Sequence, residues 1–313
     1  MVGLLSLSLA IYGCGDRGGG TQTVKTVDWA LGTSGSGSSP YIMGGVICDV
    51  ANKTMEGLKV SPQVTAGFEE NVGLVAKQSV QLGEASNNVV ISGYGKYPDI
   101  RGLFNFLLSP IHVAVDARKG IKSIGDLKGK TVNIGAPGQA TRKIAEALLN
   151  AYGLKPGDYK ASALTTGEAV EALKDGHVDA VILLAETPMP GIAEVAVTRE
   201  IDLLPLEGPQ AEKFNADIGD LLTTTVIPAG TYKGVNHDTP TMAMAVAVIA
   251  HKDLDAELVY KFTKSVWSNL DKLQAAHEGF RSLKLDKSAI SGWSKVPLHP
   301  GAEKYFKEAG VIK

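Results

Sequence analysis

Residues 133–148, NIGAPGQATRKIAEAL, decide the fold because they join a short strand to a helix through a glycine turn. The end of the strand, 132–136, is apolar, and Pro137 and Gly138 mark the turn. Apolar residues then recur at helical spacing, at Ile144, Ala145, Leu148 and Leu149. The first amides of a helix lack internal partners and the helix dipole makes this end positive, so we expect the junction to suit an anionic group.

Size and composition limit the possible classes of protein. A chain of 313 residues can bury a large core and is long enough for two lobes. With 31 basic and 33 acidic residues and no Lys/Arg run, the sequence argues against nucleic acid as a partner. Hydrophobic residues make up 44% of the chain, and no apolar run after residue 14 approaches the roughly 20 residues of a membrane helix. We therefore expect a soluble mature protein.

The first residues, MVGLLSLSLAIYGCGD, are typical of an export signal. The segment 11–14 resembles a lipoprotein cleavage box, which predicts Cys14 as the lipidation site and a periplasmic protein anchored to the membrane by that lipid. An ordinary signal peptide is the alternative, and the lack of Lys or Arg before Leu4 leaves open a start further upstream. Residues 15–23 are predicted to be a flexible spacer. Cys48 lies in an apolar helical pattern and is predicted to be a buried thiol. The two cysteines give no metal framework, and we predict no metal or cofactor.

Strand and helix patterns alternate along the rest of the chain, which predicts parallel sheets with helices on their faces. We expect strands at 24–31, 58–65, 88–92, 131–136, 160–164 and 179–184, and helices at 39–55, 69–82, 141–152, 167–174 and 188–198. The segments 75–92 and 169–184 share one plan of helix, glycine turn and apolar strand, so two similar lobes are predicted.

Two later apolar segments, 110–115 and 241–250, are predicted to cross between the lobes, and a helix at 255–270 to return to the first lobe. Two crossings make a hinge. The expected fold is α/β, a two-lobed periplasmic binding protein (type II-like, venus flytrap) with two interdomain crossings. Its predicted parts are a signal and spacer at 1–23, lobe I at 24–112 plus 245–313, and lobe II at 113–244.

In open α/β sheets, ligands bind at the carboxyl ends of the strands, and here small polar residues dominate those ends. Arg142 would offer a carboxylate a bidentate partner, and Glu186 would suit a ligand amine. For each residue a structural role is the alternative: a tight turn, a helix cap, packing for Tyr41, or a side chain in water. The predicted ligand-binding residues are Thr33, Ser34, Ser36, Ser38, Tyr41, Asn71, Ser92, Gly138, Gln139, Ala140, Thr141, Arg142, Glu186 and Thr187.

The sequence matches none of the enzyme motifs considered, so no catalytic residue is predicted. The turn at 138–142 lacks the lysine of a phosphate-binding loop, and Pro40 stands where a dinucleotide fingerprint needs its third glycine. The histidines are scattered without metal spacing, and no nucleophile stands beside a base.

Taken together, the chain resembles the TAXI-type solute-binding proteins of TRAP transporters. The similarity runs from about Val27 to Gly310 and rests on LGTSGSGSSPY (31–41), GIKSIGDLKGK (120–130), IGAPGQATR (134–142), IPAGTY (227–232) and PLHPGAEKY (297–305). The resemblance implies a periplasmic receptor that captures a small organic acid or amino acid, often glutamate-like, and hands it to an ion-driven membrane permease.

The chain departs from this family at the predicted site. Gln139 and Ala140 stand where the family usually has serine and glycine, and Glu186 where it commonly has glycine, so a glutamate ligand does not transfer directly. The predicted mechanism is closure of the two lobes over an acid that bridges the 33–41 and 139–142 loops. A binding protein of an ATP-driven importer or sensor is one alternative. An enzyme of small carboxylates on the same fold is another.

Overall fold

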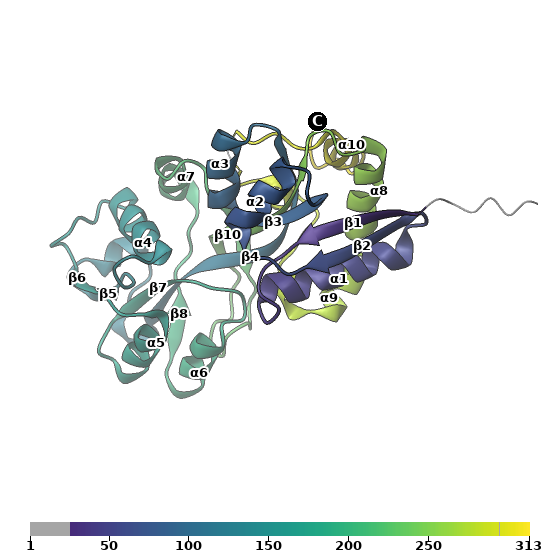
Figure 1. The fold of residues 1–313 in the computed structure, drawn as a ribbon. Helices are drawn as coiled ribbons and strands as arrows, with labels where there is room; N and C mark the ends of the chain where they lie inside the picture. Colours follow the sequence, from purple (N-terminus) through teal and green to yellow (C-terminus); the bar gives the residue numbers. More distant parts are fainter. Residues whose placement is uncertain (1–25, 294) are drawn as a thin grey trace, which may run out of the picture.

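The computed structural model describes residues 26–293 and 295–313, so the predicted signal, spacer and Cys14 lie outside the described residues. Two α/β lobes lie side by side and are joined by the long strands β4 (Ile100–Asp116) and β10 (Thr239–His251) (Figure 1). No helix in the described part of the chain is both long and apolar enough to cross a membrane.

In lobe I the strand order is β2-β1-β3-β10-β4. The strands β1 (Val27–Gly32), β2 (Leu58–Gln63) and β3 (Leu82–Ser86) are parallel, whereas β10 runs antiparallel to β3 and to β4. One face is covered by α1 (Ser39–Thr54) and the other by α2 (Phe68–Ala76) and α3 (Asn87–Lys96). Both faces of the sheet are therefore buried, as parallel sheets require.

Lobe II repeats this order as β6-β5-β7-β4-β8. The strands β5 (Thr131–Asn133), β6 (Lys160–Ser162) and β7 (Ala180–Leu184) are parallel, and β4 is antiparallel to β7 and to β8 (Ile201–Leu203). Helices α4 (Ala140–Ala151) and α7 (Gly208–Asp217) cover one face, and α5 (Thr166–Asp175) and α6 (Pro190–Thr198) the other. The likeness of the two lobes is thus one of strand order and direction.

The two long strands change partners as they pass from one lobe to the other. β4 pairs with β10 as far as Pro110 and with β7 from Ile111 onward. β10 pairs with β9 (Thr223–Ile227) at its start and with β3 near its end. The predicted fold class, α/β in two lobes with two crossings between them, is confirmed.

The C-terminal helices α8 (Ala256–Trp267), α9 (Leu270–Ala276) and α10 (Pro300–Glu308) return to lobe I and pack with α1 over its sheet. Aromatic side chains form much of this contact. Phe262 packs against Trp29 and Phe104, and Trp267 against Phe104 and Phe306, each with ring centroids 6.0 Å apart. Aromatic side chains bury large apolar areas, so these contacts stabilise the core of lobe I strongly. Cys48 is buried in the same core, as predicted.

Several predicted elements differ from the structure. The apolar segment 88–92 is not a strand but lies in α3, whose Val89 and Val90 pack against α2. The strand is the polar segment LGEAS (82–86), because it fills the gap between β1 and β10 and Gly83 leaves room for the α2 side chains. The predicted helix 69–82 ends at Ala76, and the one predicted from 188 begins at Pro190. The elements β8, α7 and β9 were not predicted.

Candidate functional site

The strand ends of lobe I are held together by one buried asparagine. Asn71 donates from Nδ2 to the carbonyl oxygens of Thr33 (2.6 Å) and Glu84 (2.9 Å), and its Oδ1 accepts from Thr65 Oγ1 at 2.8 Å. Thr33 donates its own hydroxyl to Gln63 O at 2.8 Å. Thr33 and Asn71 have no exposed surface, so these hydrogen bonds fix the buried base of the predicted ligand loop.

The loop 34–38 is closed by its own hydroxyl groups. The oxygens of Ser34 and Ser38 lie 2.5 Å apart, and Ser38 Oγ donates to Gly35 O at 2.8 Å. Ser38 also caps α1 by accepting from Tyr41 N at 3.3 Å, the usual role of a serine at this position. Ser36 is exposed at the tip of the loop, and Tyr41 is half-buried.

A buried carboxyl group lies beside this loop and was missed by sequence reasoning. Glu84 has no exposed surface, and neither of its carboxyl oxygens has a partner among the described residues. Its Oε1 lies where a side chain on Gly44 would start, 2.1 Å from the ideal Cβ position. Burial raises the pKa of Glu84 well above its usual range, so the group is held as the neutral acid. Its short sequence context, LGEAS, resembles a polar turn and gives no sign of burial.

The glycine turn of lobe II packs closely on the start of α4. Gly135 and Gly138 have φ of 89° and 86°, a region that favours glycine. Gln139 closes the turn, because its Oε1 accepts from Ala136 N at 3.2 Å and its backbone N–H donates to Ala136 O at 3.2 Å. The long amide at this position thus serves first to hold the loop.

The side chain of Arg142 runs along α4. Its Nε donates to Glu146 Oε1 at 2.9 Å, and about a third of the side chain is exposed. Thr141 is half-buried in the first turn of the same helix, and Ala140 begins it. Arg142 therefore has a partner within its own helix.

The loop after β7 meets a buried hydrogen-bond network at the crossing. His112 Nδ1 lies 3.1 Å from Pro110 O, so Nδ1 carries the proton and Nε2 accepts from Tyr232 OH at 2.9 Å. The Tyr232 oxygen in turn accepts from Met189 N at 2.8 Å. Burial lowers the pKa of His112 to about 4, only partly offset by the Pro110 carbonyl, so the ring stays neutral near neutral pH.

Thr187 reaches this network, with Oγ1 3.5 Å from His112 Nε2, while Glu186 is half-buried beside it. The predicted helix from 188 would make Thr187 its cap, but α6 begins at Pro190 and its cap residue is Met189. Ser92 is exposed on α3 and donates to Val89 O at 3.2 Å, so it does not lie at a strand end.

A cavity of about 450 Å³ lies between the lobes, within the usual range for small-molecule sites. Of the predicted residues it brings together Gly138 and Gln139. Asn88, at the start of α3, contributes from lobe I. The remaining lining residues are Lys143, Ile144, Ile218, Leu221 and Met244.

Sequence reasoning missed most of this lining. Lys143 directly follows Arg142 and could have been considered with it, whereas Ile218 and Leu221 lie in a segment with no predicted element. Every hydrogen bond made by the side chains of the 33–38 loop stays within lobe I in the described part of the chain.

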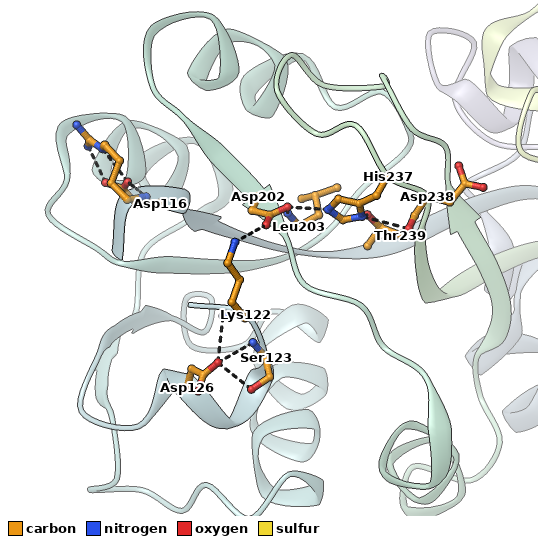
Figure 2. A network of polar contacts seen from close by, with 10 residues as sticks. Asp116, Lys122, Ser123, Asp126, Asp202, Leu203, His237, Asp238 and Thr239 are labelled. Atoms are coloured by element: carbon orange, nitrogen blue, oxygen red, sulfur yellow. Dashed lines mark hydrogen bonds and ion pairs between the residues drawn. The ribbon is translucent and has the colours of Figure 1, made fainter. Parts of the chain in front are cut away.

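A separate polar network stabilises lobe II (Figure 2). His237 Nε2 lies 2.8 Å from Asp202 Oδ1, and Lys122 Nζ lies 3.4 Å from Asp202 Oδ2. The hydrogen bond to Asp202 raises the pKa of His237. Nearby, hydrogen bonds from Arg118 hold the pKa of Asp116 well below its usual range. None of the predicted ligand-binding residues takes part, and no three metal-ligating side chains gather anywhere in residues 26–293 and 295–313.

The chain is thus a two-lobed α/β protein with a cavity between its lobes. Residues 31–310 match the NMT1-like family, and the chain belongs to that family.

Three solved structures show what the chain is similar to. The periplasmic aliphatic sulphonate binding protein SsuA from Escherichia coli is 14% identical, with a TM-score of 0.46, covering 90% of this chain and 78% of that one. The second substrate-binding domain of GlnP from Lactococcus lactis, in an open conformation, is 14% identical, with a TM-score of 0.49 and coverages of 81% and 94%. PhnD1 from Prochlorococcus marinus, in complex with methylphosphonate, is 14% identical, with a TM-score of 0.46 and coverages of 91% and 99%. At these identities and scores, the ligands of the three proteins do not transfer to this chain.

Proposed function

We propose that this chain is an extracytoplasmic solute receptor that closes on a small carboxylate or amino acid and delivers it to a TRAP-type membrane permease. The observation that carries the proposal is the cavity between Asn88 of lobe I and the Gly138–Gln139 turn of lobe II, placed beside two strands that cross between the lobes. Bending of these strands where they change partners would bring the 33–41 loop of lobe I and the 139–142 loop of lobe II together.

In the closed state Ser36, Ser38 and Tyr41 of lobe I would face Gln139 and Thr141 of lobe II. Closure removes water, which strengthens every hydrogen bond and charge contact to the ligand. Arg142 would leave Glu146 to reach the carboxylate. Glu186, which has no hydrogen-bond or ion-pair partner among the described residues, would then receive an amine.

The first test is a thermal-shift screen of organic acids and amino acids on the purified protein, followed by small-angle scattering with and without each hit. We expect a rise in melting temperature together with a smaller radius of gyration. Folded protein that binds no acid or amino acid would contradict the receptor proposal.

The coupling to a TRAP-type permease is tested separately, by uptake of the identified ligand in cells. Uptake that persists without ATP but collapses when the ion gradient is removed supports it. Uptake that needs ATP hydrolysis and not the gradient would assign the receptor to an ATP-driven importer instead.

A further inference from the structure

The interlobe cavity has one apolar wall. Ile218, Leu221 and Met244 are only partly buried and form the edge of the lobe II core that includes Ile144 and Phe214. Their remaining exposed surface therefore faces the cavity. Exposed apolar surface inside a concave site is stabilised when a ligand covers it, at about 25 cal/mol per Å².

The lining of the cavity also carries one charge. Lys143 is exposed, and none of the described carboxylates lies within ion-pair distance of its ammonium group. It is the one charged residue among the described residues that line the cavity. Arg142, next to it, is already paired with Glu146.

Gln139 adds a neutral donor beside that charge. Its Oε1 is used by Ala136 N, and its Nε2 has no partner in the described ranges. The lining of the cavity thus combines a cation and an amide N–H with an apolar wall.

We propose that the ligand is an amphiphilic monocarboxylate. Its acid group would be held by Lys143 and Gln139 and joined by the neighbouring Arg142 on closure, and its hydrocarbon body would lie against Ile218, Leu221 and Met244. This rests on the proposed function and narrows its ligand class. A dicarboxylate of the same length would place a second charge against the apolar wall, where burial of an unpaired charge is costly.

The test is calorimetry with two homologous series, straight-chain monocarboxylates and dicarboxylates of four to eight carbons. Each methylene buried on the apolar wall is worth about 0.8 kcal/mol, so affinity for the monocarboxylates should rise about fourfold per carbon until the cavity is full. At every length the monocarboxylate should bind more tightly than the dicarboxylate.

Paired variants separate the contribution of the apolar wall from that of the Lys143 charge. Leu221→Ser and Met244→Ser should flatten the dependence on chain length, whereas Val197→Ser, an equivalent change at a residue on α6 that is 65% exposed, should not. Lys143→Gln should weaken the binding of acids of every chain length by a similar factor, about tenfold. Lys160→Gln, which removes the same charge from an exposed position on β6, should leave affinity unchanged.

The inference is overturned if affinity is independent of chain length in the parent protein, or if a dicarboxylate or glutamate binds more tightly than the monocarboxylate of equal length. Either result leaves the receptor function standing. If folded protein binds no acid of any kind, the proposed function fails and the inference falls with it.

Discussion

The buried carboxyl group of Glu84 predicts an unusual dependence of stability on pH. The folded protein keeps the proton on Glu84 because burial raises its pKa, whereas the unfolded chain releases it near pH 4.3. Between those two pKa values unfolding releases one proton. The free energy of unfolding should therefore fall by about 1.4 kcal/mol per pH unit as the pH rises from about 5. The contribution is fully present below the unfolded pKa and is lost at higher pH.

The perturbation that tests this is Glu84→Gln, which has no titrating proton. Urea unfolding at a series of pH values from 5 to 8 gives the stability of both proteins. The difference between them should grow by about 1.4 kcal/mol per unit in favour of Gln until the folded pKa of Glu84 is reached. An amide poorly accommodated at the site would shift this difference by a constant and leave its slope unchanged. Glu56→Gln, at an exposed position, is the control for the removal of a carboxyl group. A difference that stays constant over this range would refute the assignment of a buried neutral acid.

Three further predictions follow from single contacts. Gly44→Ala places a methyl group 2.1 Å from the Glu84 carboxyl oxygen and should destabilise the protein by about 1–3 kcal/mol in urea unfolding, with most of the loss recovered in the Gly44→Ala/Glu84→Ala double variant. Tyr232→Phe leaves the Met189 N–H unpaired and His112 Nε2 with only the 3.5 Å contact to Thr187, and should cost about 1–3 kcal/mol by the same measurement. An unchanged midpoint would show that water replaces the hydroxyl. If closure moves Arg142 from Glu146 to the ligand, calorimetry should show Arg142→Ala weakening binding about tenfold to a hundredfold, and Glu146→Gln strengthening it up to about fivefold; unchanged affinity in both would remove Arg142 from the site.

The sequence predicted the architecture well because hydrophobic patterns decide which segments are buried. The long apolar segments in β4 and β10 contribute to the cores of both lobes, and the glycine turn at 135–138 joins a strand to a helix, both as predicted. The strand was wrongly predicted at 88–92 rather than 82–86 because the hydrophobic pattern does not decide burial in this segment. Tertiary pairing put the polar residues of LGEAS into the centre of the sheet, and local pattern contains no information about that pairing.

The candidate site was less predictable, because the direction of a side chain depends on its neighbours. Arg142 and Lys143 are adjacent, yet the first lies along its helix toward Glu146 and the second lines the cavity. Ile218 and Leu221 line the cavity because the α7–β9 connection passes beside it, and no strand-end rule indicates that connection.

In each lobe a buried asparagine side chain bonds to backbone groups near the carboxyl ends of the strands. In lobe I, Asn71 bonds to the backbone of Thr33 and Glu84; in lobe II, Asn133 accepts from Leu164 N at 2.9 Å. Parallel strands that stop at one edge leave backbone groups without a ladder partner, and a buried amide side chain satisfies them. In lobe I this holds the start of the 33–38 loop, and in lobe II it holds the backbone at Leu164, whereas the glycine turn at 135–139 is held by the side chain of Gln139. On the proposed function, selectivity would reside in the polar side chains that line the cavity, which makes Lys143 and Gln139 the first positions to change in order to alter the class of ligand.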